Sequence, residues 1–171
     1  MTHATLIFSS EQTVVPKIVL QPMQSDPSVP HPVLGVALGE YEYSVLGETG
    51  GLSQFGVHIE VLPPGSHSSL HHWHETEDEM IYMLSGEVVL VEETETLIKA
   101  GDVACWPAGH PVGHHLENRS TAKASYLTIG TRKTKDVIHY PDHDLISHKD
   151  GDARRHTHAD GRPFDSGAKH D

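Results

Sequence analysis

Residues 65–86 read GSHSSLHHWHETEDEMIYMLSG, and this stretch decides how the rest of the chain is interpreted. It contains His72 and His74, two positions apart, and it places Glu79 at the start of a short apolar run. Residues two apart on a strand point to the same face, so His72 and His74 present two imidazoles to one side. An antiparallel neighbour that begins at Glu79 can bring a carboxylate level with them. Two neutral nitrogens and one anionic oxygen on one face are ligands suited to a divalent transition metal.

The sequence around this stretch predicts short strands joined by turns. Residues 54–62 alternate apolar and polar side chains, with the period of two of a half-buried strand. Residues 80–84 and 87–91 are apolar runs separated by a Ser-Gly pair, which predicts a hairpin. Residues 123–130 predict one more strand. Many short strands at regular spacing, without a helical period, predict an all-β sandwich or closed barrel.

The strands predicted over residues 80–84 and 87–91 are apolar on both faces. Ile81 and Met83 alternate with Met80, Tyr82 and Leu84. A strand with this composition is covered on both sides. A small barrel can cover its outer face with terminal arms or with a second copy, so we expect a homodimer.

A second segment, residues 101–118, reads GDVACWPAGHPVGHHLEN. A turn containing Pro107 and Gly109 leads into a strand that carries His114 and Asn118 on one face. His114 is the natural fourth ligand of the metal centre, and the adjacent His115 is the alternative.

At these residues the chain resembles the cupin superfamily. The first cupin motif, with a histidine pair, a glutamate and a glycine at fixed spacing, is matched by His72, His74, Glu79 and Gly86. The second motif is matched by Gly101, Pro107, Gly109, His114 and Asn118. The sequence departs from the motifs in two turns: six residues instead of five separate Gly65 from His72, and four instead of two separate Gly109 from His114. Turns tolerate insertions, and the spacing to Asn118 favours His114 over His115.

The resemblance implies a double-stranded β-helix, also called a jelly-roll barrel, of the kind found in small bacterial single-domain cupins to which no activity is attached. We expect an N-terminal arm over residues 1–30, the barrel over 31–146 and a polar C-terminal tail over 147–171. The metal centre would consist of His72, His74, Glu79 and His114. Its one divalent ion could be Fe, Mn, Ni, Cu or Zn, because ligand type does not choose among them.

Several other side chains of ligand type are expected to lie outside this centre. His71 is out of phase with His72 and should point outward. Cys105 is on a strand and should be a small core residue. Trp73 and Trp106 are expected to pack in the barrel wall. The acids predicted to form a solvated turn are Glu75, Glu77 and Asp78, and the histidines predicted to be solvated in the tail are His156 and His158.

Composition excludes several classes of function. A length of 171 residues fits one domain, and one cysteine allows no internal disulfide. The formal charge of −12 argues against nucleic acid as a partner, because such binding needs clustered Lys and Arg. The first residues lack the features of a signal peptide, and no run approaches the roughly 20 apolar residues of a membrane span. We therefore expect a cytoplasmic protein that does not bind membranes.

The predicted function is that of a metal-dependent cupin acting on a small molecule bound at the three-histidine, one-glutamate centre. The reaction could be of the oxygenase, isomerase or lyase type. The alternative is a cupin that binds or senses a small molecule without converting it, since the sequence identifies no general acid or base outside the ligand set.

Overall fold

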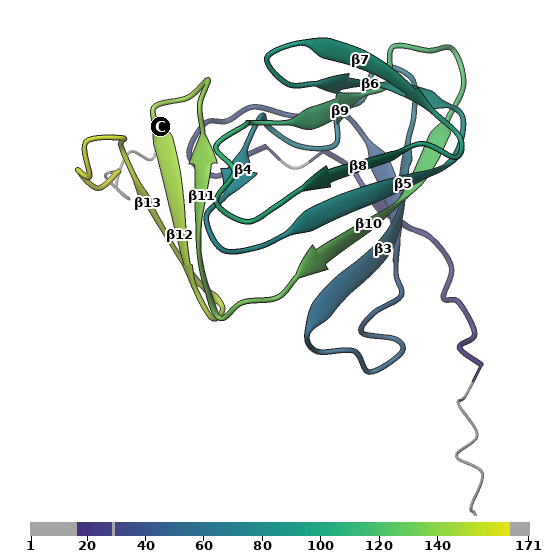
Figure 1. Ribbon diagram of the computed structural model, residues 1–171, viewed down its shortest axis with the longest axis horizontal. Coiled ribbons are helices and arrows are strands. Elements are labelled where there is room, and N and C mark those ends of the chain that lie inside the picture. The colour runs from purple at the N-terminus through teal and green to yellow at the C-terminus, as the bar shows by residue number, and fades with distance from the viewer. Residues whose placement is uncertain (1–16, 29, 165–171) are drawn as a thin grey trace, which may run out of the picture.

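The computed structural model describes residues 17–28 and 30–164, and every helix or strand in these ranges is a β-strand (Figure 1). The alternating segments predicted at residues 54–62, 80–84, 87–91 and 123–130 all form strands. The strands are β1 (Gln24–Asp26), β2 (Tyr41–Val45), β3 (Phe55–Leu62), β4 (Trp73–His74), β5 (Glu79–Ser85), β6 (Glu87–Val91), β7 (Glu95–Lys99), β8 (Val103–Trp106), β9 (His115–Glu117), β10 (Ala124–Thr131), β11 (Lys135–Tyr140), β12 (Leu145–Asp150) and β13 (Ala153–Thr157).

The strands form three sheets in which the paired strands are antiparallel. A six-stranded sheet has the order β1-β2-β3-β10-β5-β8, and a three-stranded sheet has the order β7-β6-β9. A four-stranded sheet, β13-β12-β11-β4, stands at one end of the other two (Figure 1). The all-β class and the jelly-roll architecture predicted from the sequence are confirmed.

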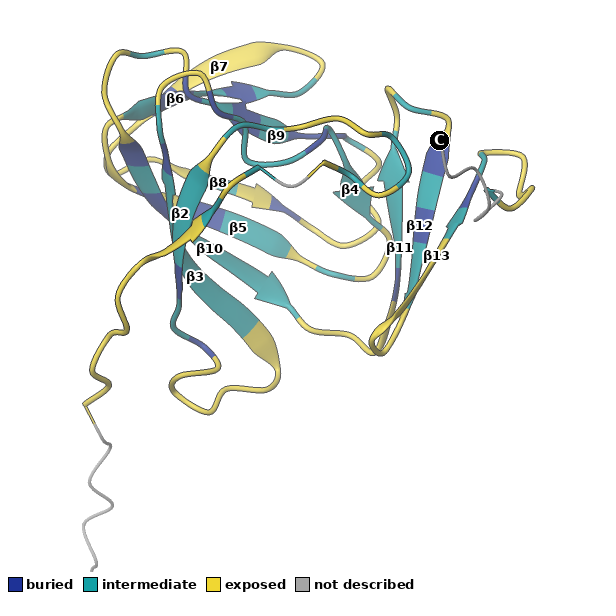
Figure 2. Ribbon diagram, turned by 180° about the vertical axis from the view of Figure 1, so that it is seen from behind, coloured by how far each residue is buried: buried dark blue, intermediate teal, exposed yellow. Residues whose placement is uncertain are grey.

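The hydrophobic core lies between the six-stranded and the three-stranded sheets. Figure 2 shows buried residues on strands of both sheets, whereas most of β7 is exposed. Leu62, Met83 and Ala124 have no exposed surface. Burying a Leu or Met side chain stabilises a fold by about 1.5–3 kcal/mol. The cluster contains Leu62, Ile81, Met83, Val88, Leu90, Ile98, Trp106, Leu116, Ala124 and Tyr126.

The predicted hairpin between β5 and β6 is wrong. β5 pairs with β10 and β8, whereas β6 pairs with β7 and β9. The chain therefore crosses from one sheet to the other at Ser85 and Gly86. Gly86 has a φ of +74°, and a Cβ at this position would lie 2.8 Å from the Cα of Ala124. A Ser-Gly pair between apolar runs marks a turn, but it does not show which strand is the partner.

The polar segment predicted as a C-terminal tail is folded at least as far as residue 157. It contains most of β12 and all of β13, which pair along their length, and His156 lies opposite Ser147. Strands with few apolar side chains are stable here because the neighbouring strands satisfy their backbone hydrogen bonds. The domain boundaries themselves stay a prediction, and residues 1–16 and 165–171 lie outside the described residues.

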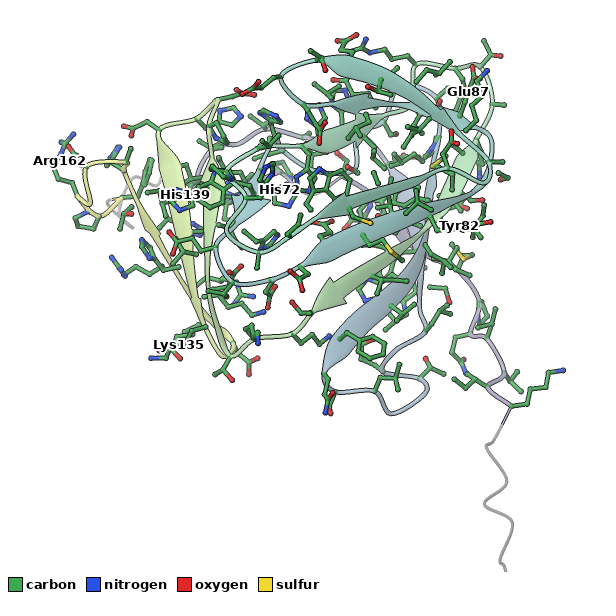
Figure 3. The ribbon with its side chains drawn as sticks, viewed as in Figure 1. His72, Tyr82, Glu87, Lys135, His139 and Arg162 are labelled. Atoms are coloured by element: carbon green, nitrogen blue, oxygen red, sulfur yellow. The ribbon has the colours of Figure 1, made fainter. Side chains whose placement is uncertain are left out.

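The second apolar face of β5 lies on the outside of the six-stranded sheet. Ile81 and Met83 are buried, whereas Tyr82 and Leu84 are each 40% exposed. The side chain of Tyr82 is labelled in Figure 3. Val103, on the adjacent strand β8, is 52% exposed. Within residues 17–28 and 30–164, this outer face is therefore left partly exposed.

In the described part of the chain, no helix has the length and apolar character needed to cross a membrane.

Candidate metal centre

The two histidines of the first motif lie on a segment that runs antiparallel to the second motif. The amide of His114 donates to the carbonyl oxygen of His72 at 2.9 Å, and the amide of His72 donates to that of His114 at 3.3 Å. Residues directly opposite each other in an antiparallel pair project to the same face. His74 follows two positions later on β4, where it is opposite Ile138 of β11. The three imidazoles therefore come from two chain segments that hydrogen bonds hold in register.

Glu79 is the first residue of β5, between β10 and β8. It lies opposite Gly130 on one side and Trp106 on the other. Alternation along β5 places Glu79 on the same face as the buried residues Ile81 and Met83. The phase predicted for this strand from the sequence is the one observed.

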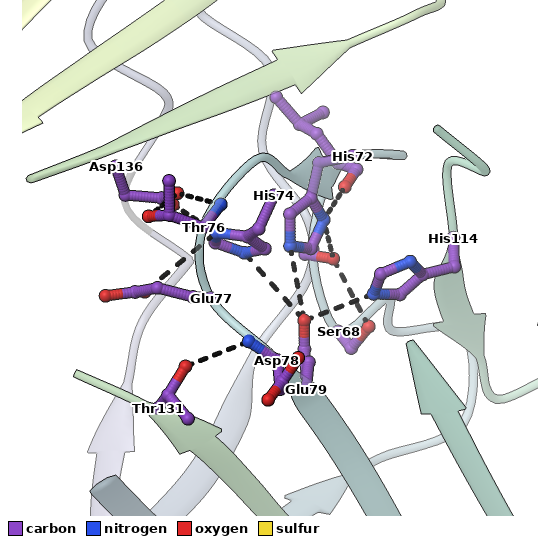
Figure 4. Close-up of polar contacts among 12 residues, drawn as sticks. Ser68, His72, His74, Thr76, Glu77, Asp78, Glu79, His114, Thr131 and Asp136 are labelled. Carbon is purple, nitrogen blue, oxygen red and sulfur yellow. Dashed lines mark hydrogen bonds and ion pairs between the residues drawn. The ribbon is translucent and has the colours of Figure 1, made fainter. Parts of the chain in front are cut away.

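The four side chains meet at one carboxylate oxygen of Glu79 (Figure 4). The Nε2 atom of His114 lies 3.1 Å from Glu79 Oε2. The Nε2 atoms of His72 and His74 each lie 3.8 Å from the same oxygen. The ligand atoms of His72, Glu79 and His114 all lie within 4.8 Å of one another. His74 is next to this group because its Nε2 contacts Glu79 Oε2. The structure therefore brings all four predicted residues together.

His114, not His115, faces this centre. His114 is 3% exposed, and its ring stacks on Trp106 with centroids 3.8 Å apart and planes 6° from parallel. His115 projects to the opposite face of the strand, where its Nε2 lies 3.0 Å from Glu117 Oε1. Trp106 is a packing residue as predicted, and the stack also fixes the plane of the His114 imidazole.

Hydrogen bonds fix the tautomers of His72 and His74. The Nδ1 of His72 lies 2.8 Å from the carbonyl oxygen of Leu70, and the Nδ1 of His74 lies 2.6 Å from Asp136 Oδ2. Carbonyl and carboxylate oxygens only accept hydrogen bonds, so Nδ1 carries the hydrogen in each of these two rings when it is neutral, and Nε2 keeps its lone pair. His114 differs: its Nδ1 is 3.4 Å from the carbonyl oxygen of Val112, whereas its Nε2 hydrogen-bonds to Glu79 Oε2 at 3.1 Å.

Burial and the neighbouring charges favour a neutral imidazole at His72 and an ionised carboxylate at Glu79. Burial lowers the pKa of His72 to about 4, and this effect outweighs the attraction of Glu79. Burial by itself would raise the pKa of Glu79. The hydrogen bond with His114 and the proximity of His72 and His74 outweigh it, so that this pKa is lowered to about 2. At neutral pH His72 and Glu79 are therefore deprotonated, as metal ligands must be.

This geometry fits a metal ion. Ligand nitrogens and oxygens lie about 2.0–2.2 Å from zinc, so two ligands of one ion are separated by roughly 3–4 Å. The distances from Glu79 Oε2 to the three Nε2 atoms, 3.1 Å and twice 3.8 Å, fall in this range. Three imidazoles and one carboxylate also form a donor set that transition metals accept.

Asp136 is a site residue that sequence reasoning missed. Its side chain has no exposed surface, and its Oδ2 accepts the hydrogen bond from His74. Its Oδ1 accepts from the amide and the hydroxyl of Thr76, at 2.9 and 2.8 Å. Together these hydrogen bonds lower the pKa of Asp136, although burial opposes them. Asp136 lies on β11, and only the pairing of β4 with β11 brings it to His74, so no local pattern in the sequence could have identified it.

Three expectations about neighbouring residues are wrong. Glu77 is not a solvated turn residue, because its side chain is 13% exposed and its Oε1 accepts from the Lys149 ammonium at 2.6 Å. His71 lies outside the centre as predicted, but it packs against Gly113 and the ring of His115 instead of projecting into solvent. Cys105 is exposed and does not belong to the core. The alternation of side chains on β8 places Cys105 on the outer face because Trp106 faces inward.

The histidines predicted to be solvated in a tail are also held by the fold. His156 is on β13, and its ring lies edge-on to His31 at 5.7 Å. The Nδ1 of His158 bonds to Asp144 Oδ2 at 2.8 Å. Both lie apart from the groups of ligand-type side chains found in the described residues.

A pocket of about 600 Å³ opens from the candidate metal centre. His72, His74 and Glu79 line it. Four cationic residues also line it: Arg132, Lys133, Lys149 and Arg154. Glu77, Asp78 and Asp152 are the other acidic lining residues.

Comparison with known proteins identifies the family. Residues 58–130 match the family model of the cupin domain. A solved sugar phosphate isomerase of a cupin superfamily, from Silicibacter pomeroyi, is 37% identical, with a TM-score of 0.81 over 88% of this chain and 98% of that chain. A protein from Acidithiobacillus ferrooxidans, provisionally named a sugar phosphate isomerase, is 29% identical, with a TM-score of 0.69 over 74% of this chain and 82% of that one. The comparison with curated proteins gave no match. This chain belongs to the cupin superfamily, as shown by its fold, its two motifs and its 37% identity to the Silicibacter pomeroyi protein.

Proposed function

We propose that this chain is a metal-dependent isomerase of a phosphorylated sugar, with one divalent transition-metal ion held by His72, His74, Glu79 and His114. One observation carries the proposal: three imidazoles converge on one carboxylate, and that carboxylate and two of the imidazoles line a pocket that four cationic residues also line. The similarity to the Silicibacter pomeroyi protein, which is named a sugar phosphate isomerase, supports the reaction class.

The charges in the pocket suit an anionic substrate. Arg132 forms an ion pair with Glu48, and Lys149 forms one with Glu77. Arg154 donates only to backbone carbonyl oxygens in the hydrogen bonds found for it. Among the lining residues, cationic and acidic side chains are equal in number, so a divalent ion would give the pocket a net charge of about +2. A phosphate monoester carries a charge between about −1.5 and −2 at pH 7, which this pocket would neutralise.

Glu60 is our candidate for the group that moves a proton. It lines a smaller cavity of about 190 Å³ together with His72, Glu79 and His114. The Tyr126 hydroxyl donates to Glu60 Oε2 at 2.8 Å, which fixes the carboxyl group. Burial raises the pKa of Glu60 above its usual range, and general acids and bases work best when their pKa lies near the operating pH.

The isomerase proposal requires little chemistry beyond this site. A divalent ion would polarise a carbonyl or hydroxyl group of the sugar. Interconversion of an aldose and a ketose moves one hydrogen between adjacent carbons and one proton between the oxygens on those carbons, and it needs neither an oxidant nor a second substrate. Glu60 would take the proton from one carbon and return it to the next.

The test combines metal analysis with an assay of isomerisation. The purified protein is stripped with a chelator, reloaded with each of Fe, Mn, Ni, Cu and Zn, and incubated with phosphorylated aldoses and ketoses and with the free sugars. We expect turnover of a phosphorylated sugar only after reloading. Glu60→Gln should lower the rate at least about 100-fold with an unchanged metal content. Tyr126→Phe is the matched control, because it keeps the carboxylate and removes only its hydrogen-bond donor.

The same assays separate the other functions. Oxygen uptake with the iron-loaded protein would indicate an oxygenase, and release of a smaller fragment would indicate a lyase. Tight binding of a phosphorylated sugar without any conversion would instead indicate a binding or sensing protein. Any of these three results would refute the isomerase proposal.

We also propose that the outer face of the six-stranded sheet packs against a second copy of this chain. Tyr82, Leu84 and Val103 are exposed there, and an apolar groove of about 560 Å³, lined in part by Met80 and Ile129, lies on the same strands. Sedimentation equilibrium should give the mass of a dimer for the wild type and of a monomer for Leu84→Glu. A monomeric wild type would refute this part of the proposal.

A further inference from the structure

A second group of metal-ligand side chains lies on the face of β9 that points away from the candidate metal centre. It consists of His67, His115 and Glu117, which we call the outer His–Glu cluster. One ligand atom from each residue lies within 4.8 Å of the other two. Glu117 Oε1 is 3.0 Å from His115 Nε2 and 3.7 Å from His67 Nδ1. The two imidazole rings are 5° from parallel, with centroids 5.7 Å apart.

The backbone holds the cluster in place from two chain segments. His67 and Glu117 form an antiparallel β-bridge. On either side of it, the Asn118 amide donates to the Ser66 carbonyl oxygen at 3.0 Å, and the Ser68 amide donates to that of Leu116 at 2.9 Å. His115 and Glu117 are two apart on β9, so they share a face. The three side chains therefore stay together without long-range rearrangement.

The ionic partners of Glu117 leave one of its oxygens available. Arg119 donates to Glu117 Oε2 at 2.6 Å, so that Oε1 is the oxygen that faces the two imidazoles. Arg119 also makes two hydrogen bonds with Glu95, at 2.7 and 2.8 Å, which balance its charge. Two imidazole nitrogens and one carboxylate oxygen form the donor set of many zinc sites with three protein ligands.

We propose that the outer His–Glu cluster binds a second divalent transition-metal ion of the zinc type, with solvent completing its coordination. The three separations, 3.0 Å, 3.7 Å and at most 4.8 Å, suit ligands around one ion with small movements of the rings. This ion clamps the segment that contains His67 to β9. The segment that contains His67 continues to His72, and His114 directly precedes His115. The ion therefore stabilises both chain segments that carry imidazoles of the candidate metal centre, which we call the inner centre.

Counting bound zinc in single variants tests the proposal. The chain, without a polyhistidine tag, is stripped with a chelator, dialysed against Zn²⁺ and measured by atomic emission. We expect His67→Ala to bind one zinc ion fewer than the wild type, whatever the inner centre holds. His67 is suited to substitution because its side chain is 43% exposed and contributes little to the core. His110→Ala, which removes an exposed histidine outside all the ligand groups, is the control and should bind as many ions as the wild type.

A second arm isolates the outer cluster from the inner centre. In His72→Ala/His74→Ala, which leaves only Glu79 and His114 at the candidate metal centre, Zn²⁺ should still raise the unfolding temperature, and in the triple variant that also carries His67→Ala this increase should disappear. Equal zinc content in the wild type and His67→Ala would overturn the proposal, as would the same increase in the triple variant. Failure of the isomerase proposal would not affect either result, because neither measurement depends on turnover.

Discussion

Replacing Asp136 by Asn should weaken metal binding at the inner centre without unfolding the protein. Asp136 Oδ1 accepts two hydrogen bonds from Thr76, and Oδ2 accepts the bond from His74 at 2.6 Å. An asparagine whose oxygen stays with Thr76 presents an amide donor to His74. The imidazole then takes the other tautomer, in which Nε2 carries the hydrogen and cannot bind a metal ion.

The magnitude follows from what this hydrogen bond contributes. A hydrogen bond to a charged group is worth about 1.5–3 kcal/mol, and loss of an outer partner of a metal-binding histidine typically costs about 10–100-fold in affinity. These figures agree, because each tenfold change in affinity is about 1.4 kcal/mol. We therefore expect the dissociation constant of Asp136→Asn to rise about 10–100-fold.

Competition with a chromophoric chelator at pH 7.5 measures this constant. The background His67→Ala is used throughout, so that the outer cluster does not contribute. Thr76→Val is the matched control: it removes the hydroxyl bond to Asp136 at 2.8 Å but leaves the carboxylate on His74, and it should change the affinity less than about threefold. If Asp136→Asn keeps the circular dichroism spectrum of the wild type and binds within about twofold of its affinity, the role assigned to Asp136 is wrong.

Three further predictions concern stability. Trp106→Ala should lower the free energy of unfolding by about 3–5 kcal/mol, because Trp106 is 6% exposed and stacks on His114; urea denaturation measures the loss, and Trp106→Phe should lose less. Asn118→Ala should cost about 2–4 kcal/mol, since its side-chain amide donates to two carbonyl oxygens at 2.7 and 2.8 Å, and an unchanged urea midpoint would contradict this. Burial lowers the pKa of His72 to about 4 from 6.5, so the unfolded chain takes up a proton on this imidazole between these values. The free energy of unfolding of the metal-free protein should therefore fall by up to roughly 3 kcal/mol as the pH falls from 6.5 to 4. Urea denaturation of His72→Gln and of the wild type at both pH values should show that this fall is smaller in the variant by that amount.

Much of the fold could be predicted from local patterns. Alternation of apolar and polar side chains predicted the strands that became β3, β5, β6 and β10, and it predicted the inward phase of Glu79. The pairing of β5 with β10 and β8 was not predictable, because strand partners are chosen by contacts between segments far apart in the chain. Cys105 illustrates the same limit: its strand was predicted, but the face on which it lies depends on which side of that strand the barrel closes.

The candidate site divides in the same way. The spacing of His72, His74 and Glu79 is local, and a motif of this kind shows in the sequence as soon as a strand is recognised. Asp136 is 62 residues from His74, and their contact exists only because β4 pairs with β11. The polar segment beyond residue 147 was predicted to be a tail because composition does not reveal that a neighbouring strand satisfies its backbone.

The sequence by itself determined the fold class, the family resemblance and three candidate ligands of the inner centre, His72, His74 and Glu79, because side-chain periodicity and motif spacing are properties of short segments. Only the tertiary structure decided that His114 and not His115 faces Glu79, that Asp136 fixes the tautomer of His74, and that His67, His115 and Glu117 lie together on the opposite face. Each of these depends on the register between strands that are distant in the chain. That register is set by how the whole barrel buries its core and satisfies its backbone hydrogen bonds.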